Sequence, residues 1–258
     1  MEFRPCIDIH NGKVKQIVGS SLRDERDAAC ENFVSEQDAA FFADFYKKNG
    51  IRGGHIILLN PPESPYYRVS KEQALTALAA YPQGLQIGGG IHADNAQEYL
   101  EAGASHVIVT SYVFKDGCIK YDNLEKLVEK AGKNKIVLDL SCRKKDGRYY
   151  IVTDRWQNYT KVELRESTLE TLRAYCDEFL VHAVDVEGKA QGIEEQVAEI
   201  LGDWGKIPIT YAGGVHNFHD LETLKRLGKG KINVTIGSAL DLFGGTMEWG
   251  EVLSKIGE

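Results

Sequence analysis

Short apolar segments of strand length alternate with segments of helical periodicity along the whole 258-residue chain. This alternation is typical of βαβ units, in which helices cover a parallel sheet. The apolar segments are nearly continuous, as expected of strands that are buried on both faces. The eight segments that we predict to be strands are Cys6–Ile9, His55–Leu59, Leu85–Gly88, His106–Thr110, Lys135–Leu140, Phe179–Val184, Ile207–Tyr211 and Ile232–Ile236.

The intervening segments carry apolar residues three or four positions apart, which predicts amphipathic helices. One of them carries Phe41, Phe42, Phe45 and Tyr46 and ends at Asn49-Gly50, a pair that commonly ends a helix. No linker or shift in composition divides the chain. Eight strands and about eight helices in a chain of this length favour a closed barrel over an open sheet. We therefore expect the α/β class and a single domain, residues 1–258, folded as a (β/α)8 TIM barrel.

Three short motifs recur in the same order in the two halves of the chain, at offsets of 131, 124 and 127 residues. A repeat of this kind indicates a duplicated half-barrel, with halves of about residues 1–130 and 131–258. The matched segments are Cys6-Ile7-Asp8-Ile9 with Val137-Leu138-Asp139-Leu140, Gly89-Gly90-Ile91-His92 with Gly213-Gly214-Val215-His216, and Val109-Thr110-Ser111 with Ile236-Gly237-Ser238.

Asp8 and Asp139 are carboxylates in otherwise apolar strands, the first and the fifth of the predicted barrel. Barrel active sites form at the C-terminal ends of the strands, so the two aspartates should face each other across the mouth. A buried, unpaired carboxylate costs several kcal/mol. Each aspartate therefore either belongs to a structural ion pair, for example with Lys13 or Arg143, or acts in a general acid–base pair. Their matching positions favour the acid–base pair.

Glycine pairs, Gly89-Gly90 and Gly213-Gly214, follow the third and seventh predicted strands, and Thr110-Ser111 and Gly237-Ser238 end the next strand of each half. Glycine lets the backbone approach a ligand and point N–H groups at it, and a following helix N-terminus favours an anion. The alternative is that these glycines only form tight turns. Two symmetric copies favour phosphate binding, and they predict a long ligand with a phosphate at each end.

The end of the sixth predicted strand brings His182, Asp185 and Glu187 close together. A lone strand histidine is more often structural, whereas the two acidic residues lie nearer the loop and should face the mouth. The residues themselves leave open which of the three contacts a substrate.

The segment from Arg143 to Trp156 predicts a β-hairpin with Asp146-Gly147 at its turn. Trp156 on such a loop would stack on a heterocycle, and Arg143 would bind a carboxamide or phosphate. The alternative is a surface hairpin packed on the rim of the barrel.

Composition excludes several classes of function. The formal net charge is -7, which argues against nonspecific nucleic-acid binding because that needs a basic field. The five cysteines are widely spaced and form no cluster with histidine, so we expect no metal site and reduced thiols in the cytoplasm. They are Cys6, Cys30, Cys118, Cys142 and Cys176. We expect no signal peptide, no membrane span and a monomer.

Taken together, the motifs resemble the half-barrel family of histidine biosynthesis, which comprises an isomerase and a cyclase. The resemblance covers essentially the whole chain. It is carried by Ile7-Asp8-Ile9-His10-Asn11-Gly12-Lys13-Val14, Gly88-Gly89-Gly90-Ile91, Val107-Ile108-Val109-Thr110-Ser111, Ala212-Gly213-Gly214-Val215 and Ile236-Gly237-Ser238-Ala239-Leu240. The segments 137–144, 182–188 and 237–245 resemble the fungal-type isomerase rather than the common bacterial form.

The resemblance implies a cofactor-free Amadori rearrangement that converts a bisphosphorylated aminoaldose to its aminoketose. Asp8 would then be the base at C2 of the ribosyl arm. Asp139 would be the acid that protonates the ring oxygen, and Trp156 would stack on the imidazole.

The bacterial pattern has Thr at the end of strand six, followed by Arg-Asp-Gly. Alignment on Gly188 places His182 at the Thr and Glu187 at the Asp. Asp185 matches the Asp if the loop is one or two residues shorter. We take Asp185 as the third catalytic residue and His182 as a substrate-binding one. The family's Asp-Leu-Asp-Gly-Ala after strand two is replaced by Leu59-Asn60-Pro61-Pro62-Glu63.

Three alternatives stay open. The cyclase is fed ammonia by a glutaminase, but its pattern after strand seven, Ala-Ser-Gly-Gly-Ala-Gly, differs from the segment Tyr211–Val215 here. A bifunctional isomerase would also accept phosphoribosylanthranilate. A catalytically silent barrel would only bind phosphate metabolites, and it would not need paired aspartates in apolar strands.

Overall fold

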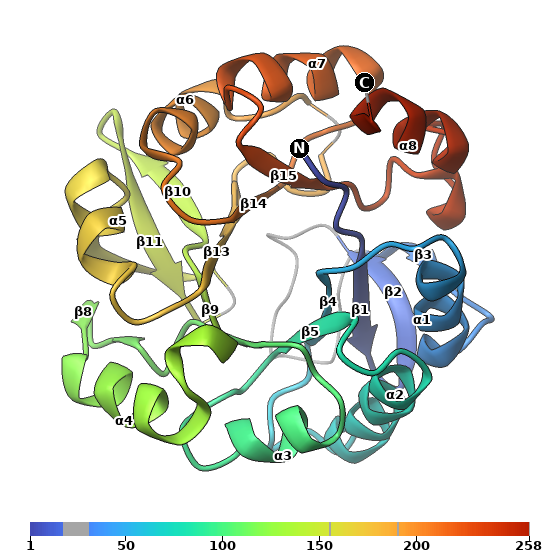
Figure 1. Ribbon diagram of the computed structural model, residues 1–258, viewed down its shortest axis with the longest axis horizontal. Coiled ribbons are helices and arrows are strands. Elements are labelled where there is room, and N and C mark those ends of the chain that lie inside the picture. The colour runs from blue at the N-terminus through green and yellow to red at the C-terminus, as the bar shows by residue number, and fades with distance from the viewer. Residues whose placement is uncertain (18–30, 155, 190, 258) are drawn as a thin grey trace.

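The computed structural model describes residues 1–17, 31–154, 156–189 and 191–257. Eight parallel strands form an inner ring that is surrounded by helices (Figure 1). In spatial order the strands are β1 (Cys6–His10), β4 (Gly54–Leu58), β5 (Leu85–Gly88), β6 (Val107–Val109), β9 (Ile136–Asp139), β13 (Glu178–His182), β14 (Ile209–Ala212) and β15 (Ile232–Thr235).

The ring closes between β15 and the segment that precedes β1. Phe3 bridges Val234 in parallel, and Arg4 N and Val234 N donate hydrogen bonds of 2.9 Å to Val234 O and Glu2 O. The fold is therefore the (β/α)8 barrel that the alternation predicts, and each of the eight predicted strands overlaps one barrel strand.

The helices cover the outside of the barrel (Figure 1). They are α1 (Ala39–Lys48), α2 (Tyr67–Ala80), α3 (Ala96–Glu101), α4 (Tyr121–Ala131), α5 (Glu166–Leu172), α6 (Glu195–Trp204), α7 (Phe218–Leu227) and α8 (Trp249–Gly257). Asp38 caps α1 by accepting from Phe41 N, and Asn217 caps α7 by accepting from Asp220 N. The predicted stop of α1 at Asn49 is confirmed. None of the helices in the described part of the chain is long and apolar enough to cross a membrane.

Short antiparallel strands lie outside the ring of eight parallel strands. The predicted hairpin is confirmed: β10 (Cys142–Lys145) and β11 (Arg148–Thr153) turn at Asp146-Gly147, and β12 (Asn158–Glu163) adds a third strand. The antiparallel strands β2 (Lys13–Ile17) and β3 (Glu31–Val34), which extend the sheet from β1, are absent from the prediction. A short pair, β7 (Phe114–Lys115) and β8 (Cys118–Ile119), lies near the start of α4.

The interior of the barrel is built in layers, because alternate residues of each strand point inward. The apolar layer is a separate cluster of the buried residues Ile108, Val137, Leu180 and Ala212, and the partly buried Ile57 packs against it. Two residues further along β9 and β13, the same inward face carries Asp139 and His182. The strands are thus apolar at their centres and polar where they reach the mouth.

Below the apolar layer, at the N-terminal ends of the strands, a buried ion pair joins Arg4 to Glu178. Glu178 also accepts hydrogen bonds from Gln86 Nε2 at 3.0 Å and from Thr210 Oγ1 at 2.7 Å. These partners come from β5, β13, β14 and the segment before β1. The pair therefore fills the bottom of the barrel with fully satisfied polar groups.

Removal of one member of this pair should destabilise the protein more than removal of both. We expect Glu178→Leu to lower the free energy of unfolding by about 3 kcal/mol, because the mostly buried Arg4 guanidinium loses its buried partner and keeps only the exposed Glu2 carboxylate. The double variant Arg4→Met/Glu178→Leu should recover much of that loss. Denaturant unfolding measures both, with Asp44→Asn of the exposed Asp44–Lys48 pair as a control that changes little. Equal losses in the single and double variants would contradict the account.

Candidate active site

A cavity of about 670 Å³ opens at the C-terminal ends of the barrel strands. Its walls are the inward-facing residues at the strand ends and the loops that follow them. Of the predicted site residues, the structure brings twelve to this cavity: Asp8, Gly89, Gly90, Thr110, Ser111, Asp139, Trp156, His182, Gly213, Gly214, Gly237 and Ser238. Arg143 and Asp185 do not line it.

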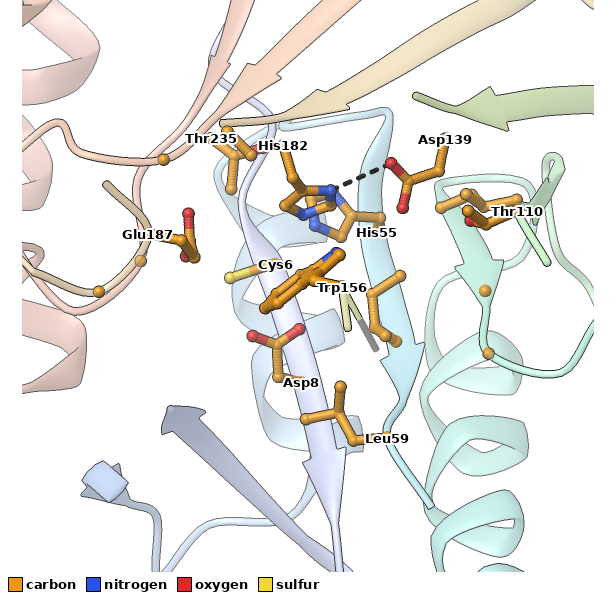
Figure 2. Close-up of a pocket in the computed structure, with 18 of the residues that line it drawn as sticks. Cys6, Asp8, His55, Leu59, Thr110, Asp139, Trp156, His182, Glu187 and Thr235 are labelled. Carbon is orange, nitrogen blue, oxygen red and sulfur yellow. Dashed lines mark hydrogen bonds and ion pairs between the residues drawn. The ribbon is translucent and has the colours of Figure 1, made fainter. Parts of the chain in front are cut away.

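Asp8 faces the cavity from β1 (Figure 2). Burial and the nearby carboxylate of Glu187 raise the pKa of Asp8 to about 7, although the charge of His182 acts in the opposite direction. A carboxylate with a pKa near neutrality can both take up and release a proton at physiological pH. Asp8 therefore has the properties of a general base.

Asp139 and His182 form a pair on neighbouring strands, with Nδ1 of His182 3.3 Å from Oδ1 of Asp139 (Figure 2). The same Oδ1 accepts hydrogen bonds from Ser141 N at 2.9 Å and Ser141 Oγ at 2.7 Å. Burial acts to raise the pKa of Asp139, but the charge of His182 and these hydrogen bonds hold it below its ordinary value. Conversely, Asp139, Glu187 and Asp8 outweigh burial and raise the pKa of His182 to about 9. The pair is therefore a carboxylate beside an imidazolium.

Trp156 reaches into the same region from the loop between β11 and β12. Its indole Nε1 donates a hydrogen bond of 2.9 Å to Ser141 Oγ, and its ring lies 5.7 Å from that of His182. The loop tryptophan is thus tied to the Asp139 pair through Ser141.

Asp185, which we predicted as the third catalytic residue, lies outside the cavity. Its Oδ1 accepts from Arg143 Nε at 2.9 Å, and its Oδ2 accepts from Lys144 N at 2.8 Å. These bonds attach the loop after β13 to the base of the hairpin, so neither Asp185 nor Arg143 reaches the cavity. The structure instead places Glu187 there, and burial raises the pKa of the Glu187 carboxyl.

The two glycine pairs occupy equivalent places in the two halves. Gly89 and Gly213 have φ of 102° and 119°, a region that L side chains rarely adopt. A Cβ would lie 2.2 Å from Leu58 O at Gly89, and 2.8 Å from Ala183 O at Gly213. Each glycine therefore allows one βα loop to pass directly against the end of the neighbouring strand, where the loop lines the cavity.

Some cavity residues were missed by the sequence reasoning. His55 lies on β4 with its ring 6.1 Å from that of His182, and burial together with the charge of His182 lowers its pKa to about 3. Cys6 precedes Asp8 on the inward face of β1, and burial raises the pKa of its thiol. Both are polar residues in apolar strands, the signal that identified Asp8, but neither was matched by the repeat.

The described part of the chain holds no group of three or more His, Cys, Asp or Glu residues that could bind a metal ion. Four of the five cysteines, Cys6, Cys118, Cys142 and Cys176, are free thiols. The fifth, Cys30, lies outside the described residues.

Comparison with known proteins places these features in a family. The model described as "Histidine biosynthesis protein" matches residues 2–247. A protein of Medicago truncatula named 1-(5-phosphoribosyl)-5-((5-phosphoribosylamino)methylideneamino) imidazole-4-carboxamide isomerase, chloroplastic, is 52% identical over 98% of this chain and 81% of its own length. Isomerases of the same name from Neurospora crassa and Saccharomyces cerevisiae are 47% and 44% identical, over 94% and 95% of this chain and 93% and 94% of theirs. The chain belongs to the histidine biosynthesis protein family.

Proposed function

We propose that this protein is the aldose–ketose isomerase of histidine biosynthesis that converts the bisphosphorylated aminoaldose ProFAR to its aminoketose, PRFAR. The observation that carries the proposal is the pairing of Asp8 with Asp139 and His182 in one cavity that is flanked by two equivalent glycine-lined loops. Relatives that bear the name of this isomerase match nearly the whole chain. One barrel domain, built from two half-barrels, performs the reaction as a monomer in the cytoplasm.

The substrate spans the mouth of the barrel. One phosphate binds at Gly89-Gly90 with Thr110-Ser111, and the other binds at Gly213-Gly214 with Gly237-Ser238. Backbone N–H groups exposed by glycine suit a phosphate even in an acidic protein. Trp156 stacks on the imidazole ring between them, and the ribosyl arm that reacts lies beside Asp8.

The reaction consists of proton transfers, which two positioned acid–base groups can perform. The Asp139–His182 pair supplies a proton to the ring oxygen O4′ as the C1′–O4′ bond breaks, and the amino nitrogen forms a double bond to C1′. Asp8 then removes the proton from C2′, which yields an enolamine. Return of that proton to C1′ and loss of the O2′ proton give the ketose, so every atom of the substrate is kept.

Glu187 assists Asp8. The negative charge of Glu187 raises the pKa of Asp8, so it helps Asp8 to hold a proton. A proton taken from C2′ by Asp8 is therefore held close to the substrate until it returns to C1′.

Incubation of the purified protein with ProFAR alone, without ammonia or a glutaminase, tests the proposal. We expect conversion to the ketose, measured by chromatography of the products. Failure to convert ProFAR, or turnover only when ammonia is supplied, would overturn it. A parallel assay with phosphoribosylanthranilate shows whether the protein is also bifunctional.

Asp8→Asn should lower kcat by several orders of magnitude while the far-UV circular dichroism spectrum stays unchanged, because an amide cannot take the C2′ proton. In the wild type, kcat/KM should fall as the pH drops below about 7, where Asp8 becomes protonated and can no longer act as a base. Steady-state kinetics between pH 5.5 and 8 measure both effects. Near-normal turnover by Asp8→Asn would remove Asp8 from the mechanism.

Glu187→Gln and Asp185→Asn are matched variants: the first removes a carboxylate that lines the cavity, and the second removes one that lies outside it. We expect Glu187→Gln to lower kcat by about 10-fold to 100-fold and to shift the acidic limb of the pH profile to lower pH, since the neighbouring charge is gone. Asp185→Asn should keep kcat within a few-fold of the wild type, because Asp185 binds Arg143 outside the cavity. The reverse ranking of the two variants would restore Asp185 as the catalytic residue.

A further inference from the structure

We infer that Nε2 of His182 is the proton donor in the ring-opening step, and that Asp139 holds the charge of this imidazole without giving up a proton itself. The inference rests on the proposed isomerisation and adds to it the atom from which the proton leaves. It changes the roles implied by the family resemblance, in which the strand-five aspartate is the acid.

The groups around Asp139 donate hydrogen bonds to it, which suits an ionised carboxylate. Three donor groups converge on its Oδ1: the backbone N–H of Ser141 at 2.9 Å, the Ser141 hydroxyl at 2.7 Å, and Nδ1 of His182 at 3.3 Å. Ser141 is fully buried, so water does not compete for these bonds. Hydrogen bonds to the charged form stabilise a carboxylate against protonation, which makes Asp139 a poor proton donor.

The groups around His182 favour its protonated, positively charged form. Carboxylates from three directions influence it: Asp139 on β9, Asp8 on β1, and Glu187 in the loop after β13. His55, the histidine that faces it from β4, is held neutral by burial and by the charge of His182. With a pKa of about 9, His182 carries its proton throughout the neutral range.

The imidazole of His182 lies in the wall of the substrate cavity. Among the described residues, the hydrogen bonds of His182 to Asp139 and Ser141 both use Nδ1. Figure 2 shows the ion pair on the side of the ring toward Asp139, while the ring itself lies among the residues that line the cavity. Nε2 is therefore left to donate to a sugar oxygen.

His182 gives up one proton and takes back another in each reaction cycle. The Nε2 proton passes to O4′ as the C1′–O4′ electron pair moves onto that oxygen, and the lone pair of the amino nitrogen forms the new bond to C1′. The imidazole, now neutral, accepts the O2′ proton when the ketone forms, so His182 ends the cycle as an imidazolium. Asp139 remains a carboxylate throughout.

His182→Thr distinguishes the two possible donors. Threonine is the residue of the bacterial pattern at this position, and its hydroxyl still supports Asp139 as an acid, whereas it has no proton to give at neutral pH. We expect kcat to fall by at least about 100-fold, the typical contribution of a general acid, with KM changed only a few-fold. The wild-type loss of kcat above about pH 9 should disappear in the residual activity. His106→Thr, at the His106–Asp177 pair outside the cavity, is the matched control and should keep normal turnover.

The charge of His182 can be measured without any substrate. In ¹⁵N-histidine NMR spectra at pH 7.5, both nitrogens of His182 should be protonated in the wild type, and Asp139→Asn should make the ring neutral. A neutral His182 in the wild type, or near-normal turnover by His182→Thr in an active enzyme, would overturn the donor role alone. Complete absence of isomerisation by the wild-type protein would overturn the proposed function together with it.

Discussion

Asp8, Asp139, Glu187, His55 and His182 line one cavity at the end of the barrel, and their charges have to balance because burial leaves them poorly screened. At one side of the cavity, the negative charge of Asp139 and the positive charge of His182 neutralise each other. Burial, and then repulsion by the charge of His182, lower the pKa of His55, so His55 stays neutral. Asp8 and Glu187 remain, and burial with mutual repulsion raises the pKa of Asp8 into the neutral range. The acid–base behaviour of each group is thus set by its neighbours, and Asp8 has a pKa suited to exchanging a proton with carbon.

The architecture of the barrel creates this cluster. Because alternate residues of every strand point inward, a short strand contributes two or three residues to the interior. The apolar layer that includes Val137 and Leu180 separates two polar regions. The lower one, around Arg4 and Glu178, is saturated with hydrogen bonds and stabilises closure. The upper one keeps Nε2 of His182 and the Asp8 carboxylate available for a ligand.

The fold, and the presence of Asp8 and Asp139 in one cavity, could be predicted because each depends on a pattern along the chain: apolar segments of strand length, and a lone carboxylate repeated at the same place in each half. Which of Asp185 and Glu187 reaches the cavity could not be predicted from the sequence. The two residues lie two positions apart in a loop, and the bond to Arg143, 42 residues away, decides which one turns outward. The link from Trp156 through Ser141 to Asp139 likewise depends on how the hairpin folds back over the mouth. His55 gives a weaker signal, since an isolated strand histidine is usually structural.

In the proposed reaction, a ligand with a phosphate at each end lies across the mouth of the barrel, with its reacting carbons between Asp8 and His182. A crystal structure with the aminoketose product bound tests this most directly. We expect one phosphate at Gly89-Gly90 and Ser111, the other at Gly213-Gly214 and Ser238, and the former ring oxygen within about 3 Å of His182 Nε2. A product with both phosphates on one side of the barrel, or with its sugar carbons out of reach of Asp8, would contradict the account.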